Sequence, residues 1–203
     1  MTTASDPTAL RYTAAVLCGG HSTRMGTDKA WLPAPDSATN RPLLLRQLDL
    51  LGLLQPAPAE RLVSARSGQP LPPLPATVGR LDDPGTHGPL GGLVNLLRHL
   101  STPHLLVIPV DTPHLDPRSL QRLLDAARKC PDRSFVARSP HGVEPLVALY
   151  ARSLAPLFAQ AVADRHLGLR RLLTSATVGP HLDQVDFPTP DAFTNWNTPD
   201  DRR

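Results

Sequence analysis

The sequence is short of cysteine, of aromatic side chains and of lysine. Two cysteines, Cys18 and Cys130, are too few for a disulfide framework and are not spaced as a C-x-x-C metal pair. Aromatic residues make up 4% of the chain, so a core must be built from Leu, Val and Ala. The chain has two lysines, Lys29 and Lys129, and nineteen arginines. Because lysine is so rare here, its compact ammonium group is of interest at each position.

Long apolar runs and dense basic runs are also missing. No segment approaches the roughly 18 apolar residues of a membrane-spanning helix, and residues 1–11 are polar, without a signal-peptide pattern. The net charge of +3 comes without a basic, aromatic-interleaved face for nucleic acid. We expect a cytoplasmic protein in a reducing setting, with no membrane or nucleic-acid partner. Residues 1–11 would be a flexible tail and residues 12–203 a single domain.

One segment, residues 14–30, is typical of a phosphate-binding loop. It starts as an apolar run with the length of a buried strand and continues through two adjacent glycines, an Arg, a third Gly and a Lys. Glycines let the backbone approach a ligand closely, and successive N–H groups in such a turn attract anions. Arg24 and Lys29 add two positive charges. The segment predicts nucleoside triphosphate binding; the alternative is a surface loop in which these charges fall by chance.

The two common phosphate motifs are absent. Five residues lie between Gly20 and Gly26, whereas the P-loop has four, and G-x-G-x-x-G does not occur here. Residues 17–29 instead resemble, without a gap, the signature L-x-G-G-x-S-x-R-M-G-x-D-K of the molybdenum cofactor guanylyltransferases, within the nucleotidyltransferase superfamily. The resemblance implies an α/β fold of three layers around a mostly parallel sheet, Rossmann-like and GT-A-like.

The hydrophobic pattern agrees with an α/β chain, because short apolar runs alternate with helical stripes. The pattern predicts strands at 13–17, 61–65, 77–81, 104–110, 135–138, 144–150 and 185–187. It predicts helices at 42–54, 88–100, 117–129, 151–163 and 169–173, with prolines at 42, 89 and 117 as first helical residues.

A carboxylate follows the predicted central strand at 104–110. Ligands of open parallel sheets bind beyond the carboxyl ends of the strands, so Asp111 is well placed to hold a divalent cation. The alternative is a turn or capping role. However, Asp116 is already placed to cap the next helix ahead of Pro117. Asp111-Thr112-Pro113 resembles the family's D-x-P element, which implies that Asp111 binds Mg²⁺.

The last residues also resemble the family. Residues 195–201 are similar to its N-x-N-T-P-E-D terminus, which implies that Asn197 is a second metal ligand beside Asp111. Thr198 is better explained as the cap of a short final helix.

The resemblance also implies a nucleotide site. Residues 88–92 resemble the family's G-P-L-A-G element beside the guanine. Ser64 falls where the family contacts the nucleotide, although an ordinary polar role is equally open, and Cys18 is expected to pack beneath the loop rather than react. The implied nucleotide-binding residues are Leu17, Cys18, Gly19, Gly20, Lys29, Ser64, Asp83, Gly88 and Asp111.

The second substrate would lie beside two further segments. Residues 144–150 resemble the family's Q/H/E-P-L-x-A-x-Y strand, and Glu144 either faces that substrate or is a solvent-exposed hairpin residue. Arg165, Arg170 and Arg171 form a basic group that either receives a pterin phosphate or is a solvated helix face.

The reaction implied by the resemblance is transfer of GMP from GTP to molybdopterin, which releases pyrophosphate. The attacking phosphate is already an anion, so the chemistry needs alignment and charge neutralisation rather than a general base. Arg24, Lys29 and Asp111 are the expected catalytic residues, with Mg²⁺ as cofactor. The alternatives are a cytidylyl- or sugar-phosphate nucleotidyltransferase and a non-catalytic carrier of GTP or cofactor. Other cofactor-biosynthesis proteins or apo-molybdoenzymes are the candidate protein partners.

Overall fold

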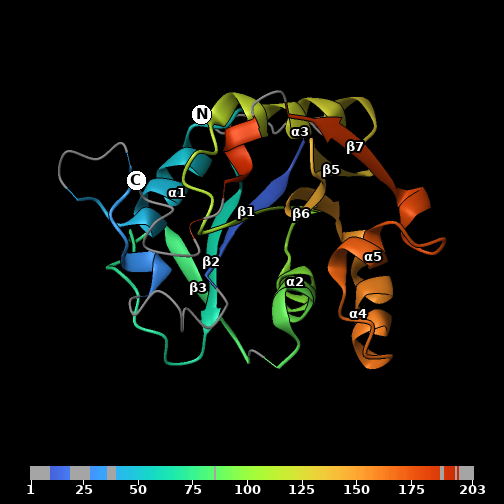
Figure 1. The fold of residues 1–203 in the computed structure, drawn as a ribbon, viewed down its shortest axis with the longest axis horizontal. Helices are drawn as coiled ribbons and strands as arrows, with labels where there is room; N and C mark the ends of the chain where they lie inside the picture. Colours follow the sequence, from blue (N-terminus) through green and yellow to red (C-terminus); the bar gives the residue numbers. More distant parts are fainter. Residues whose placement is uncertain are drawn as a thin grey trace, which may run out of the picture.

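The computed structural model describes residues 10–18, 28–35, 40–84, 86–187, 190–194 and 196. Within these residues seven strands form one sheet in the order β3-β2-β1-β4-β6-β5-β7 (Figure 1). The strands are β1 (Tyr12–Leu17), β2 (Glu60–Arg66), β3 (Val78–Asp83), β4 (His104–Pro109), β5 (Ser134–Ser139), β6 (Gly142–Ala151) and β7 (Leu182–Asp186).

Strand direction determines where a ligand can bind. Strands β1 to β4 run parallel, β6 is antiparallel to both β4 and β5, and β7 is parallel to β5. Leu17 at the end of β1 is in register with Ser64 on β2 and Pro109 on β4. The carboxyl ends of three neighbouring strands therefore meet at one edge of the sheet, where open α/β sheets bind ligands.

Helices cover both faces of the sheet and make three layers. Helices α1 (Leu43–Gly52) and α3 (Pro117–Lys129) pack on one face, and α2 (Gly88–His99), α4 (Ala155–Ala163) and α5 (Leu169–Leu173) on the other (Figure 1). Short 3₁₀ turns are η1 (Lys29–Trp31), η2 (Arg152–Leu154), η3 (Gly179–His181) and η4 (Pro190–Phe193). The predicted three-layer, mostly parallel α/β architecture is confirmed.

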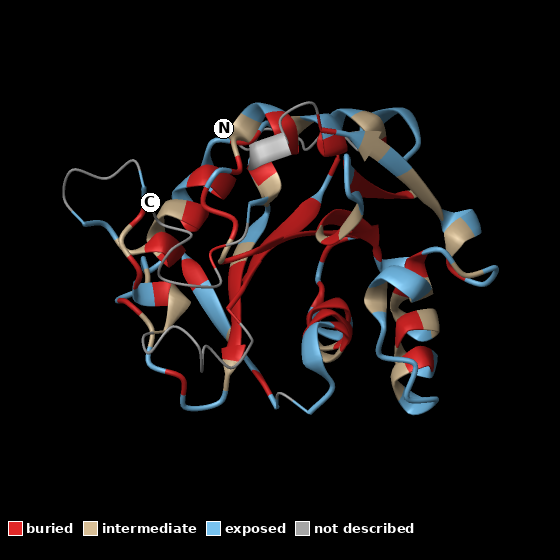
Figure 2. Ribbon diagram, viewed as in Figure 1, coloured by how far each residue is buried: buried red, intermediate tan, exposed pale blue. Residues whose placement is uncertain are grey.

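The core is built from aliphatic side chains on both faces of the central strands. Every residue of β1 and β4 is buried, as expected for strands covered on both sides (Figure 2). Leucines spaced three or four residues apart give α1 and α2 their buried stripes. None of the helices in the described part is both long and apolar enough to cross a membrane.

Several element ends differ from the predicted ones. Pro42 is the N-cap of α1 rather than its first residue, with extended backbone angles. The helix expected from residue 151 begins later, because Ala151 is the last residue of β6 and η2 precedes α4. Of the tail predicted over residues 1–11, residues 1–9 lie outside the described residues, and Leu10 is buried in the core.

Candidate functional site

Lys29 and Asp111 meet at the carboxyl ends of β1 and β4. The Lys29 Nζ lies 2.7 Å from Asp111 Oδ2, and the two side chains are 17% and 22% exposed. The ladder between the strands continues past their ends, because the Val110 N–H donates to the Leu17 carbonyl. A cation and a carboxylate that are 82 residues apart in the sequence thus share one partly buried cleft.

Three of the expected nucleotide-binding side chains surround Gly92 on α2. A Cβ atom built on Gly92 would lie 3.1 Å from Asp83 Oδ2, 3.3 Å from Leu17 Cδ2 and 3.8 Å from Ser64 Oγ. Ser64 Oγ is buried and has no hydrogen-bond partner within the part of the chain that the structure describes. A buried hydroxyl without a partner is uncommon, and it supplies an unused donor and acceptor here.

Cys18 and Gly88 flank this group of residues. The Cys18 N–H extends the β1–β2 ladder by donating to the Ser64 carbonyl, and its side chain is buried. Burial, together with the nearby Asp28 carboxylate, raises the pKa of the Cys18 thiol well above its ordinary value. The thiol is therefore suited to packing rather than to reaction. Gly88 begins α2 with a φ of +57°, a conformation that favours glycine.

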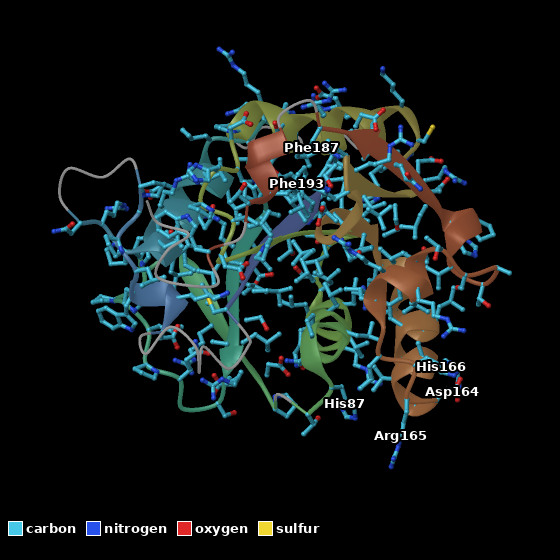
Figure 3. The ribbon with its side chains drawn as sticks, in the orientation of Figure 1. His87, Asp164, Arg165, His166, Phe187 and Phe193 are labelled. Atoms are coloured by element: carbon cyan, nitrogen blue, oxygen red, sulfur yellow. The ribbon has the colours of Figure 1, made fainter. Side chains whose placement is uncertain are left out.

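A pocket of about 600 Å³ opens beside Asp111. It lies between the ends of β4 and β6, the first turn of α2 and the segment that carries α5. The lining residues are Pro89, Pro109, Asp111, Thr112, Glu144, Pro145, Leu146, Val147, Leu167, Gly168, Leu169, Arg170, Arg171 and Phe193. The ring of Phe193 packs 5.2 Å from that of Phe187, centroid to centroid, which fixes η4 at the rim (Figure 3).

The pocket brings together some of the residues expected on the side of the second substrate. Glu144 Oε2 pairs with Arg170 Nη2 at 3.2 Å, and its Oε1 accepts from the Ser139 hydroxyl at 2.7 Å. The Glu144 side chain is 18% exposed, so it belongs to the cleft rather than to an open hairpin. Arg171 also lines the pocket, but Arg165 does not. Arg165 is exposed and extends from the C-terminal end of α4 (Figure 3). Of the three arginines that were grouped, only Arg170 and Arg171 therefore line this pocket.

Four expected site residues, Gly19, Gly20, Arg24 and Asn197, lie outside the described residues. The residue before Asn197 is described. The backbone N–H of Trp196 donates to the backbone carbonyl of Asp111 at 3.0 Å. The Trp196 indole is buried and packs edge-on to the His114 ring. The end of the described chain therefore returns to the tip of β4.

Two buried glutamines brace the site, and sequence reasoning missed both. Gln47 on α1 donates from Nε2 to the carbonyls of Thr112, at 2.8 Å, and Pro109, at 3.4 Å, on either side of Asp111. Gln69 donates from Nε2 to Asp28 Oδ2 at 2.7 Å. Gln47 could have been found, because it interrupts a leucine stripe. Gln69 follows β2 in a proline-rich segment that carries no such signal.

A doubly wound sheet with a lysine and a carboxylate facing each other at its carboxyl edge, beside a pocket of about 600 Å³, agrees with the nucleotidyltransferase class, which the family match shows. Residues 14–183 match the family described as the MobA-like NTP transferase domain, and the chain belongs to that family.

Known proteins agree with this assignment. A probable molybdenum cofactor guanylyltransferase of Chloroflexus aggregans is 35% identical over 96% of this chain and 93% of its own length. The structure of molybdopterin-guanine dinucleotide biosynthesis protein A of Archaeoglobus fulgidus superposes with a TM-score of 0.65 at 23% identity over 94% of each chain. A Mycobacterium tuberculosis protein, solved as a complex with manganese, gives a TM-score of 0.61 at 22% identity, covering 94% of this chain and 95% of its own.

Proposed function

We propose that this protein transfers GMP from GTP to molybdopterin, giving the guanine dinucleotide cofactor and pyrophosphate. The observation that carries the proposal is the 2.7 Å contact between Lys29 and Asp111. These residues come from the two segments whose motifs most closely resemble the guanylyltransferases. The names of the curated relatives, over almost the whole chain, support the same reaction.

Mg²⁺ fits the residues that are present. Asp111 is a partly exposed carboxylate that lines the pocket, and no group of three His, Cys, Asp or Glu that could hold a metal occurs among the described residues. A single carboxylate suits Mg²⁺, which binds through one or two carboxylates together with substrate phosphates. Asp111 would hold the ion, with Asn197 as a second ligand supported by the contact of the neighbouring Trp196 to Asp111. When bound there, the ion supplies positive charge to the phosphate oxygens.

The chain's own cations act on the triphosphate. Lys29 and Arg24 would neutralise the charge that develops on the departing pyrophosphate, and the backbone N–H groups of Gly19 and Gly20 would hold the phosphates. The attacking terminal phosphate of the pterin needs no general base. Its oxygen forms a bond to the α-phosphorus of GTP as the bond to pyrophosphate breaks.

The base and ribose of GTP would lie over the group around Gly92. Ser64 and Asp83 offer a hydroxyl and a carboxylate next to Gly92, where the missing side chain lets α2 approach both groups closely. Gly88, at the start of the same helix, completes this side of the cleft.

Molybdopterin would enter the 600 Å³ pocket on the other side of Asp111. Arg170 and Arg171 provide positive charge for its phosphate, and the ion pair with Glu144 orients Arg170. A cofactor-biosynthesis protein or an apo-molybdoenzyme would deliver the pterin or accept the product at the open side of this pocket.

The test is incubation of the purified protein with molybdopterin, Mg²⁺ and either GTP or CTP. We expect pyrophosphate and the guanine dinucleotide with GTP and little product with CTP. Product with CTP alone, or with a sugar 1-phosphate in place of the pterin, would replace the proposal with one of the other transferase activities. GTP binding without pyrophosphate release would identify a carrier.

A further inference from the structure

The side chain of Gln69 uses both of its N–H donors, and its oxygen accepts one bond, next to the phosphate-binding segment. It is buried, and its Nε2 donates to Asp28 Oδ2 at 2.7 Å and to the Cys18 carbonyl at 3.3 Å. Its Oε1 accepts from the Arg66 N–H at 3.0 Å. A buried amide with both donors and its oxygen paired is well fixed, because breaking one of these bonds would leave a desolvated polar group.

These contacts tie together the two residues that flank segment 19–27. Cys18 continues β1, and Asp28 begins the turn that carries Lys29. The second carboxylate oxygen of Asp28, Oδ1, accepts from the Ala30 N–H at 3.0 Å and so caps η1. Gln69 therefore holds one oxygen of Asp28 while the other oxygen holds the turn from which Lys29 reaches Asp111.

Gln69 is in turn anchored to the edge of the sheet. Its own N–H donates to the Arg66 carbonyl at 2.9 Å, and its carbonyl accepts from Arg80 Nη1, also at 2.9 Å. A second nitrogen of the Arg80 guanidinium donates to the Arg66 carbonyl at 3.0 Å. These hydrogen bonds connect the ends of strands β2 and β3 to the turn that carries Lys29.

We propose that Gln69 is a positioning residue that holds Asp28, and through it the Lys29 side chain, against Asp111. Without the Nε2 donor, the Asp28 carboxylate loses the contact that orients it, and η1 is no longer fixed relative to β2. The effect on turnover rests on the proposed function, whereas the placement of Lys29 can be measured without any substrate.

The two lysines of the chain make that measurement direct. Trace acetylation in the presence of EDTA, read by mass spectrometry, compares Lys29, which is shielded in the cleft, with the exposed Lys129 in the same sample. For Gln69→Met, which keeps the volume and removes the polar groups, we expect the Lys29 to Lys129 labelling ratio to rise. The expected rise is about fivefold, as for loss of a partly shielded ion pair. Gln121→Met, which removes a half-buried glutamine with comparable bonds on α3, should leave the ratio unchanged.

An unchanged ratio in folded Gln69→Met protein would overturn the proposal. If that variant does not fold, Asp28→Asn decides the question, because it keeps an oxygen to cap η1 but turns the acceptor facing Gln69 into a donor. An unchanged ratio there also overturns the proposal.

Turnover gives a second readout. In protein that transfers GMP, Gln69→Met should lower kcat by up to about 100-fold, as for a misplaced catalytic cation, with little change in KM for GTP. An equal kcat would count against Gln69 as a positioning residue. A wild-type protein that transfers no GMP would refute the proposed function, while the labelling ratio would still decide on Gln69.

Discussion

Replacing Lys29 by alanine separates a catalytic role from a structural one. The ammonium contacts Asp111 in a cleft where both side chains are about one-fifth exposed, at 17% and 22%. Ion pairs of this exposure contribute about 1 kcal/mol or less to stability. For a chain of this size that corresponds to a fall in Tm of about 2–4 °C or less. Loss of a cation that stabilises developing charge instead costs roughly 2.7–4 kcal/mol of activation energy, or about 100- to 1,000-fold in kcat.

The assay follows pyrophosphate release and thermal unfolding of the same preparations. Lys129→Ala is the matched control, because it removes the other lysine, which is exposed at the end of α3 and is not one of the residues of the cleft. We expect Lys29→Ala to lose at least about 100-fold in kcat while its Tm stays within about 4 °C of wild type. Retained turnover, or a large fall in Tm that accounts for the lost activity, would refute the reasoning.

Three further changes test other parts of the account. Gly92→Ala should weaken GTP binding by about tenfold, because the new Cβ would lie within 3.3 Å of Asp83 and Leu17 and displace them. The stability of the protein should change little, since the higher helix propensity of alanine offsets about 1 kcal/mol of this strain. Wild-type affinity for GTP in a calorimetric titration would contradict the prediction. Arg170→Ala should raise KM for molybdopterin by about tenfold, as for loss of a charged hydrogen bond, and leave the affinity for GTP unchanged. A loss of affinity for GTP alone would show that the pocket does not bind molybdopterin. Burial lowers the pKa of His104, so the folded state takes up its proton less readily than the unfolded chain. Stability should therefore fall as the pH drops below about 6.5, and His104→Gln should flatten denaturant midpoints measured from pH 7.5 to 5.5.

The sequence predicted the elements whose signals are local. Apolar runs marked the buried strands β1 and β4, and Asp116 with Pro117 marked the start of α3, where the Asp116 carboxylate accepts from the Ser119 N–H. The position of Asp111 beyond β4 followed from strand direction alone. These features need no knowledge of the rest of the chain.

Features that depend on distant contacts were not predicted. Gln69 meets Asp28 only because β2 lies beside β1, and nothing near residue 69 indicates that neighbour. Arg165 and Arg170 are close in sequence, yet Arg170 lines the pocket and Arg165 does not. Pro42 had the pattern of a first helical residue, but the bridge between Pro33 and Pro42 keeps it extended.

The triphosphate of GTP is proposed to bind against the Lys29 ammonium group, beside Asp111. Acetylation of the two lysines with and without saturating GTP and Mg²⁺ tests it most directly. The account predicts strong protection of Lys29 and none of Lys129. Equal labelling of Lys29 in the two samples, with GTP binding verified separately, would place the triphosphate elsewhere and contradict it.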